Sequence, residues 1–453
     1  MSGLKRAALD RIPRLPNTVN RGLLALNRDP VLAFGRSYGA YRDLLARNHT
    51  QYDATEALLA AVNRALTEVP FYRRYRADGE IRSIEEFEQR IGFTDRDLVG
   101  ERWSQFTAAG TDLSRYERIT TGGTSGKPLE LLAPRDRHVI ELATMHALWG
   151  RAGYDFDVRA VMRNHRLGSG KLFTVNPVTR ELIFDGFRLD PDYFAAVYDV
   201  IVGHGIRFIH CYPSTAHEFA TFVVESGRDL SGVEAFLSGS ENVFPHQREL
   251  IENRLGVRFY TWYGHTEKLV LAGECARSTD YHVEPTYGYF ELVDDDGEVI
   301  REPGRVGEIV GTALHNPGMP LIRYRTGDVA EYVGDHCPHC DRRLPLIRNI
   351  RGRWAGDRVY NADGTFVTTT ALNLHNDLYR VIHGLQYVQE AKGELNVLVV
   401  KSPDFRERHE RALTEHFRGR LAADTRIDIR YVDRLIRKEN GKFVHIISAV
   451  ADR

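Results

Sequence analysis

Residues 120–128 combine side chains and backbone that suit the binding of a polyphosphate. They read Thr-Thr-Gly-Gly-Thr-Ser-Gly-Lys-Pro. Glycines let backbone N–H groups approach an anion closely, hydroxyls add hydrogen-bond donors, and a lysine supplies a compact positive charge. ATP is therefore the first ligand to consider. The alternative for this stretch, taken alone, is a flexible surface loop.

This loop does not have the Walker spacing. A Walker loop has four residues between its first glycine and the Gly-Lys pair, followed by a Ser or Thr that binds magnesium. Here three residues separate Gly122 from Gly126, and Pro128, which has no hydroxyl, follows Lys127. A P-loop kinase or GTPase is therefore disfavoured.

Four further motifs follow the loop in order. They are Ser-Gly-Ser-Glu-Asn at 238–242, Tyr-Gly-His-Thr-Glu at 263–267, Tyr-Arg-Thr-Gly-Asp at 324–328 and Asn-Gly-Lys-Phe at 440–443. The ordered set resembles the adenylate-forming superfamily, and within it the phenylacetate-CoA ligase-like branch that includes CapK-type proteins of capsular polysaccharide loci. The similarity covers roughly residues 100–453. It implies that ATP activates a carboxylic acid to an acyl-adenylate with release of pyrophosphate, and that CoA then accepts the acyl group.

The resemblance also implies which residues contact the nucleotide. The β- and γ-phosphates of ATP would be covered by Thr121, Gly122, Gly123, Thr124, Ser125, Gly126 and Lys127. The adenine would be contacted by Gly239, Ser240, Glu241, Tyr263 and Gly264, with the Tyr263 ring stacked on the base. Asp328 would accept hydrogen bonds from both ribose hydroxyls, and Arg353 would be a second ribose contact. An aspartate suits a diol because each of its oxygens can accept one hydrogen bond.

Three residues would carry the chemistry. The resemblance places Thr266 at the α-phosphate, Glu267 on Mg²⁺, and Lys442 between the attacking carboxylate and the α-phosphate. A carboxylate and a triphosphate repel each other, so positive charge must be delivered to the reacting phosphorus. His265, inside the same motif as Thr266, is a candidate for the acyl pocket.

One motif departs from the pattern of the family. The hinge before the mobile C-terminal domain usually reads Gly-Arg-x-Asp-Asp, whereas residues 352–357 read Gly-Arg-Trp-Ala-Gly-Asp. The domain rotation, and with it transfer to CoA, is therefore less securely implied than adenylation. Two alternatives stay open: an amide-forming synthetase with an amine as acceptor, and a non-catalytic nucleotide-binding relative in polysaccharide assembly.

The four cysteines suggest a metal site instead of disulfides. Cys337 and Cys340 have Cys-x-x-Cys spacing, which suits two thiolates on one Zn²⁺ ion or a redox pair. Cys275 and His282 are the best upstream candidates to complete a structural zinc site, and His336 and His339 compete for the fourth position. Free thiols and a redox function remain as alternatives.

The element pattern predicts an α/β protein of several parts. Residues 1–100 are expected to form a helical cap, 101–352 an adenylate-forming domain, and 353–453 a small, mobile α+β domain that carries Lys442. Within the large domain, alternating strands and helices from about 116 to 270 predict a parallel sheet covered by helices. Strands between 285 and 335, separated by turns, predict a small antiparallel subdomain.

Composition restricts the partners. The 453 residues carry 61 basic and 62 acidic side chains, so no overall field attracts nucleic acid. No apolar run is long enough for a transmembrane segment and no signal peptide is evident, so a cytoplasmic protein acting on small molecules is expected. The oligomeric state is left open, a homodimer included. Trp149, Tyr212 and Phe236 favour an aromatic or apolar acid as substrate.

Overall fold

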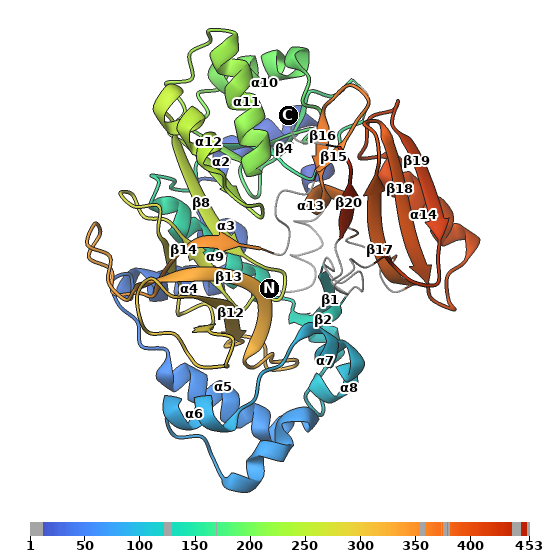
Figure 1. The fold of residues 1–453 in the computed structure, drawn as a ribbon. Coiled ribbons are helices and arrows are strands. Elements are labelled where there is room, and N and C mark those ends of the chain that lie inside the picture. Colours follow the sequence, from blue (N-terminus) through green and yellow to red (C-terminus); the bar gives the residue numbers. More distant parts are fainter. Residues whose placement is uncertain are drawn as a thin grey trace.

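The computed structural model describes residues 12–121, 129–168, 170–352, 358–372, 374, 378, 381–436 and 445–450. A large body is built around one sheet, and a smaller C-terminal sheet lies beside it (Figure 1).

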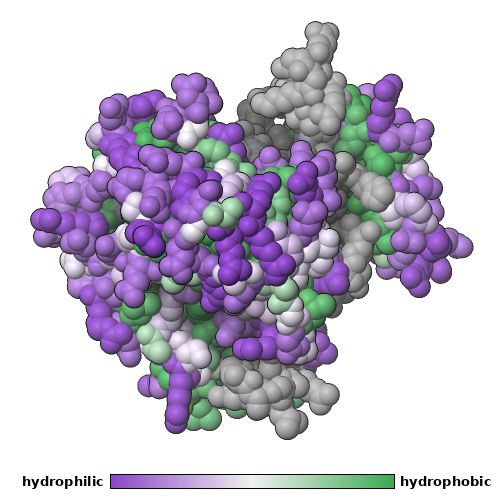
Figure 2. Space-filling view, turned by 90° about the horizontal axis from the view of Figure 1, so that it is seen from below, coloured by the Kyte–Doolittle hydropathy of each residue, from purple (hydrophilic) through white to green (hydrophobic). Residues whose placement is uncertain are grey.

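Residues 12–100 are mainly helical, as the sequence predicts. The described elements are η1 Ile12–Arg14, α2 Asn17–Leu26, α3 Pro30–Phe34, α4 Arg36–Arg47, α5 Thr55–Glu68, η2 Pro70–Asp78, α6 Ile84–Arg90 and α7 Arg96–Glu101. The Ser83 side chain accepts a hydrogen bond from the N–H of Glu86 and so caps α6. Leu58 and Phe87 turn inward to the core, while the surface on the side of α5 and α6 is mainly hydrophilic (Figure 2). Helices α5, α6 and α7 therefore cover one end of the large body, whereas α2 packs on the strand at residues 173–176 and α4 on the helix at residues 137–150.

Among the described residues, twelve strands form one mixed sheet in the order β11-β12-β13-β14-β10-β9-β8-β7-β6-β3-β5-β4. Their bounds are β3 Arg159–Met162, β4 Phe173–Asn176, β5 Glu181–Phe184, β6 Phe208–Cys211, β7 Ala235–Gly239, β8 Arg258–Gly264, β9 Leu271–Gly273, β10 Tyr281–Val283, β11 Tyr289–Val293, β12 Val306–Thr312, β13 Tyr324–Gly334 and β14 Leu346–Arg351. Strands β5, β3, β6, β7 and β8 are parallel neighbours. The α/β prediction is confirmed. The antiparallel strands do not form a separate sheet, because β9 pairs with β8 and extends the same ladder.

Helices cover both faces of the parallel strands. They are α9 Arg137–Gly150 on one face, and α10 Pro191–Gly203 and α11 Pro213–Glu225 on the other. Alternation along β6 explains the two layers: Phe208 packs with the α9 core and Ile209 with the α10–α11 core. The helical turns α12 Pro245–Arg248 and η4 Glu249–Arg254 lead into β8.

A β-hairpin frames the predicted phosphate loop. Strands β1 Tyr116–Thr121 and β2 Leu129–Pro134 pair antiparallel, with Thr121 opposite Leu129. Short helical segments α8 Trp103–Phe106 and η3 Leu113–Arg115 precede it. The predicted phosphate contacts Gly122, Gly123, Thr124, Ser125, Gly126 and Lys127 lie outside the described residues, but both ends of their loop are held by this hairpin.

The C-terminal elements form a second core. They are β15 Arg358–Tyr360, β16 Phe366–Thr368, α13 Thr369–Leu372, β17 Ile382–Gln389, β18 Glu394–Lys401, α14 Glu407–Arg418, β19 Arg426–Tyr431 and β20 Ile446–Ser448. Tyr212 of the large body belongs to the same hydrophobic cluster as Leu385 and Phe417. The boundary predicted between residues 352 and 353 stays a prediction. None of the described helices combines the length and apolar character that crossing a membrane requires.

Candidate functional site

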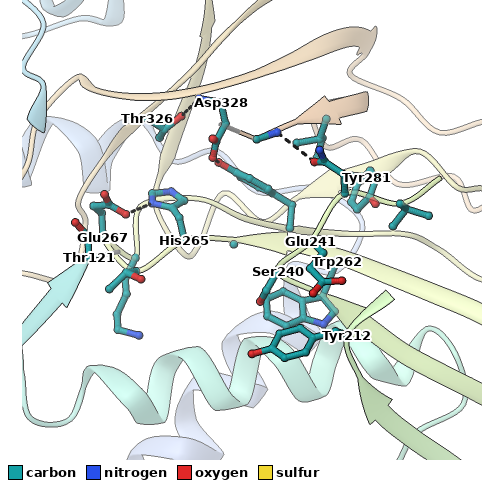
Figure 3. A pocket seen from close by; sticks show the side chains of 18 of the residues that line it. Thr121, Tyr212, Ser240, Glu241, Trp262, His265, Glu267, Tyr281, Thr326 and Asp328 are labelled. Carbon is teal, nitrogen blue, oxygen red and sulfur yellow. Dashed lines mark hydrogen bonds and ion pairs between the residues drawn. The ribbon is translucent and has the colours of Figure 1, made fainter. Parts of the chain in front are cut away.

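A cavity of about 440 Å³ opens where the parallel strands end (Figure 3). The predicted residues that line it are Thr121, Ser240, Glu241, Tyr263, Gly264, Thr266, Glu267 and Asp328. They come from β1, β7, β8 and β13 and the turns that follow, so residues more than 200 positions apart meet at one edge of the sheet. In open α/β sheets, ligands bind beyond the carboxyl ends of the strands. Arg353 and Lys442 lie outside the described residues.

The turn after β8 positions His265 and Glu267. The Nε2 atom of His265 accepts a hydrogen bond from the N–H of Val270 (3.1 Å). The proton of the neutral ring is therefore on Nδ1, which donates to Oε2 of Glu267 (3.1 Å) (Figure 3). The imidazole thus fixes the orientation of the carboxylate. His265 lines the cavity, and its place in the acyl pocket stays a prediction.

Glu267 is ionised at neutral pH. Burial raises the pKa of its carboxyl, but the interaction with His265, a backbone hydrogen bond and the charge of Arg96 outweigh burial and lower the pKa to about 2. The Tyr324 hydroxyl also donates to Oε1 of Glu267 (3.3 Å). A buried, ionised carboxylate that faces a cavity is a suitable ligand for a hard cation such as Mg²⁺.

Asp328 is held from two sides. Its Oδ2 atom accepts a hydrogen bond from the Tyr263 hydroxyl (2.8 Å), and its N–H donates to Oγ1 of Thr326 (3.1 Å). The preceding Gly327 has φ of +75°, a backbone conformation that favours glycine, and its N–H donates to Glu308 (2.7 Å). The Tyr-Arg-Thr-Gly-Asp motif therefore builds a tight bend that directs the Asp328 carboxylate into the cavity.

The motif after β7 has two different roles. Ser240 and Glu241 line the cavity, whereas Gly239 lies behind it, where a Cβ atom would come within 2.6 Å of the Trp262 ring. Ser240 has φ of +71°, which is strained for a residue other than glycine and is typical of functional sites. Oε2 of Glu241 accepts a hydrogen bond from the N–H of Ser214 at the start of α11 (3.1 Å). Burial raises the pKa of Glu241, and this hydrogen bond opposes the rise.

The wall expected to receive the acyl group is less apolar than predicted. Of the three aromatic residues proposed for it, Tyr212 lines the cavity, while Trp149 and Phe236 are buried in the cores on the two faces of the sheet. The difference arises because both side chains belong to elements whose apolar faces are needed for packing, in α9 and β7.

Several lining residues were not predicted from the sequence. They are Arg96, Glu141, Arg163, Asn164, Asn242 and Lys268. Lys268 forms an ion pair with Glu141 of α9 and has φ of +60°. Asn242 accepts a hydrogen bond from the N–H of Gly352 (3.3 Å), which connects the cavity to the segment that precedes the C-terminal elements. Lys268 directly follows the 263–267 motif, and this position could have predicted its place in the cavity. Arg163 lies in no motif, so the sequence did not indicate its place.

A second cluster lies beside β10. The Sγ atoms of Cys275, Cys337 and Cys340 and a ring nitrogen of His282 all lie within 4.8 Å of one another. These are the four residues proposed for zinc. The competing His336 is exposed and pairs with Asp341, and His339 is exposed too.

The protonation of the cluster suits a metal. Nδ1 of His282 donates to the backbone oxygen of Asp280 (3.1 Å), so Nε2, which lies 3.3 Å from Sγ of Cys340, keeps its lone pair. Burial, with the charges of Arg151 and Arg342, lowers the pKa of His282 to about 3. Burial opposes ionisation of Cys340, but hydrogen bonds from Arg342 and Cys337 outweigh it and lower its pKa. A neutral imidazole oriented by a backbone carbonyl is the usual form of a zinc-binding histidine.

Comparisons with known proteins agree with this arrangement. Residues 359–449 match the family model of the CapK C-terminal domain. The chain is 32% identical over 152 residues to the phenylacetate-coenzyme A ligase of Thermus thermophilus, which covers 32% of this chain and 34% of that protein. It is 34% identical over 122 residues to the ligase of the same name from Pseudomonas putida, which covers 25% of this chain and 26% of that protein. Parts of the chain are therefore similar to CapK-type proteins and to phenylacetate-coenzyme A ligases.

Similarity of fold to solved structures extends over most of the chain. A crystal structure of 2-hydroxyisobutyryl-CoA ligase in complex with 2-HIB-AMP and CoA matches with a TM-score of 0.54 at 17% identity, covering 87% of this chain and 89% of that one. The same ligase in the postadenylation state gives a TM-score of 0.52 at 18% identity. The sequence matches span only 26% to 34% of the phenylacetate-coenzyme A ligases. They cover 25% to 32% of this chain, so the activity and the substrate are left to experiment.

Proposed function

We propose that this protein is an AMP-forming acid-CoA ligase. A carboxylate oxygen of the substrate attacks the α-phosphorus of ATP, and pyrophosphate leaves from that phosphorus. The thiol of CoA then attacks the acyl carbon of the resulting mixed anhydride and displaces AMP. The observation that supports this most strongly is the meeting of Glu267, Thr266 and Asp328 in one cavity beside the hairpin that frames the 120–128 loop.

Each group has a role that follows from its charge. Thr266 and the donors of the 120–128 loop would hold the phosphates, Asp328 would accept the ribose hydroxyls, and Tyr263 would lie against the base. Glu267, oriented by His265, would hold Mg²⁺, which when bound neutralises negative charge on the phosphates. Lys442 would supply the second positive charge where the two anions meet.

The direct test is acid-dependent pyrophosphate exchange. Purified protein is incubated with ATP, labelled pyrophosphate and each member of a broad panel of acids, and the products are then analysed with CoA or with mixed amines. Exchange followed by a CoA thioester supports the proposal. Exchange followed only by amides indicates the amide-forming synthetase, and AMP binding without exchange for any acid indicates the non-catalytic relative.

The role of Asp328 can be tested separately. Asp328→Asn keeps the shape of the side chain but replaces one acceptor oxygen by a donor, so we expect AMP affinity to fall about tenfold or more. Tyr263→Phe removes only the hydrogen bond to Asp328 and should have a smaller effect on AMP affinity. Titration calorimetry with AMP measures both changes. Equal affinity in wild type and Asp328→Asn would contradict the ribose contact.

We propose that Cys275, His282, Cys337 and Cys340 hold a structural Zn²⁺ ion. Elemental analysis of protein purified without chelator should find about one equivalent of zinc. Cys340→Ser should reduce zinc below about half an equivalent and lower the melting temperature, because the ion joins β10 to the turn after β13. His336→Ala is the matched control and should leave zinc content unchanged, since His336 is exposed and outside the cluster. The site would be excluded if wild-type protein contained no zinc and had the same melting temperature as Cys340→Ser.

A further inference from the structure

One wall of the cavity carries an arginine at the end of a parallel strand. Arg163 directly follows β3, and Met162 of β3 pairs with Cys211, which in turn pairs with Ser238. This register brings Arg163 beside Tyr212, which directly follows β6, and beside Ser240, which directly follows β7. All three line the cavity.

The polar contacts of Arg163 are with neutral groups. One terminal nitrogen lies 2.8 Å from Nε2 of His210, and the other donates to Oγ of Ser240 (2.9 Å). Because Nε2 of His210 accepts this hydrogen bond, the ring is neutral; burial and the charge of Arg163 both lower its pKa. Among the described residues, no carboxylate lies within 4.0 Å of the Arg163 guanidinium. The acid beside it in the wall, Glu241, directs its Oε2 to the N–H of Ser214.

The positive charge of Arg163 is therefore not compensated by an ion pair within the described part of the chain. Its guanidinium lies 4.6 Å from the centre of the Tyr212 ring and 6.0 Å from that of Trp262. A guanidinium has five N–H donors, and the hydrogen bonds with His210, Ser240 and the Tyr212 hydroxyl do not use all of them.

A second donor on this wall also lacks a partner among the residues that the structure describes. Nε1 of Trp262 is buried and forms no hydrogen bond with any of them, although Trp262 lines the cavity. The indole packs against the backbone of Gly239, which restricts its rotation. A buried donor left unpaired is unfavourable, and a ligand acceptor would remove this cost.

An apolar acyl group would fit this wall poorly. It would remove water from Arg163 without supplying an acceptor, and an uncompensated buried charge is strongly unfavourable. The guanidinium also packs against the Tyr212 ring, which reduces the apolar surface available to an acyl group. A carboxylate supplies what both groups require, since its two oxygens accept from a guanidinium and from a neighbouring N–H donor.

We propose that the acid activated by this protein carries a second carboxylate, which Arg163 and Trp262 bind while the first carboxylate reacts with ATP. The substrate class is thus a dicarboxylic acid. This inference rests on the proposed function for its chemistry, but the binding of the second carboxylate does not require turnover. Arg163 is the specificity-determining residue for the acyl group.

The test compares acids that share a carbon skeleton and differ in one carboxylate. Pyrophosphate exchange is measured with adipate against hexanoate, glutarate against valerate, and carboxyphenylacetate against phenylacetate. We expect kcat/KM for the best dicarboxylate to exceed that for its partner by about tenfold or more in the wild type. In Arg163→Gln this ratio should fall to about one. In Arg163→Lys, which keeps the charge, the ratio should lie between that of Arg163→Gln and that of the wild type.

Two controls separate this role from others. Arg166→Gln changes an arginine three positions further on, which stacks on Phe187 and does not line the cavity, and it should leave the ratio unchanged. The affinity of Arg163→Gln for AMP should stay within about twofold of the wild type, because the proposed ligand of Arg163 is the acid. A tenfold loss of AMP affinity with an unchanged acid ratio would overturn the assignment in favour of a nucleotide contact.

A binding measurement decides the question even without turnover. The melting temperature of the AMP-bound protein is measured with each dicarboxylate and its monocarboxylate partner. An increase with one dicarboxylate that is lost in Arg163→Gln supports the proposal. If AMP binds but no acid supports exchange, the proposed ligase function is contradicted. The melting temperatures still test the binding of the second carboxylate in that case. Equal melting temperatures for both members of every pair, or a preference for the monocarboxylates, would overturn the dicarboxylate proposal.

Discussion

Glu267→Gln is expected to lower the rate of acid-dependent pyrophosphate exchange by about two to three orders of magnitude. The substitution preserves the shape of the side chain, and the amide oxygen can still accept the hydrogen bond from Nδ1 of His265. It removes the negative charge that is present because the folded protein lowers the pKa of Glu267 to about 2. Loss of a group that stabilises charge at the reacting phosphate typically costs this much. Exchange rates at saturating ATP and Mg²⁺ measure the effect.

The matched control is Glu331→Gln. Glu331 lies on β13, the strand of Asp328, but forms an exposed ion pair with Arg348 and does not line the cavity. Its replacement should leave exchange within about twofold of the wild type. If Glu267→Gln retains full exchange at all Mg²⁺ concentrations, Glu267 is not the magnesium ligand.

The same substitution has a consequence for stability. A depressed pKa in the folded state means that the ionised carboxylate stabilises the fold above the ordinary pKa of 4.5, and that this contribution is lost as the pH falls toward 2. The stability difference between wild type and Glu267→Gln should therefore be constant near neutral pH and shrink between about pH 4.5 and pH 2. Denaturant unfolding across this range measures the difference.

Lys442→Ala is expected to have a comparably large effect, limited to the first half-reaction. Lys442 lies outside the described residues, and its assignment rests on the Asn-Gly-Lys-Phe motif. A lysine that joins the carboxylate to the α-phosphate acts only while these two anions meet, so pyrophosphate exchange should fall by about two to three orders of magnitude. Transfer from a supplied acyl-adenylate to CoA should persist, since that step does not require the lysine.

Lys438→Ala, four residues earlier, is the control for Lys442→Ala and should leave both half-reactions unchanged. Equal losses in exchange and in transfer from the supplied acyl-adenylate would show that Lys442 acts through the structure of the C-terminal part instead of through adenylation. The two assays together therefore separate a catalytic lysine from a structural one.

The C-terminal elements connect with the cavity through two side chains of the large body. Tyr212 lines the cavity and also packs in the C-terminal core, while Asn242 holds the N–H of Gly352. The two parts of the chain therefore share side chains at the site. Movement of one against the other would change the surroundings of the acid, as the resemblance implies for this superfamily.

Local patterns in the sequence were sufficient for the resemblance to the adenylate-forming superfamily, for most elements and for the identity of the zinc candidates. The Ser-Glu cap of α6, the strand and helix alternation from β6 to β8, and the Cys-x-x-Cys pair are short-range signals, so their structural meaning does not depend on the rest of the chain. The ordered motifs at 238–242, 263–267 and 324–328 identified the cavity residues for the same reason.

Only the tertiary structure decided which side chains share the cavity and in what state. Arg163 has no motif around it, and its position against His210 and Ser240 depends on the register of three parallel strands. The ionisation of Glu267 depends on a hydrogen bond from Nδ1 of His265. The proton is on Nδ1 because Nε2 accepts a hydrogen bond from the backbone N–H of Val270. Trp149 and Phe236 looked like substrate contacts but are required by the core. Burial, register and charge pairing are properties of the packed chain, because they arise between residues that the sequence separates.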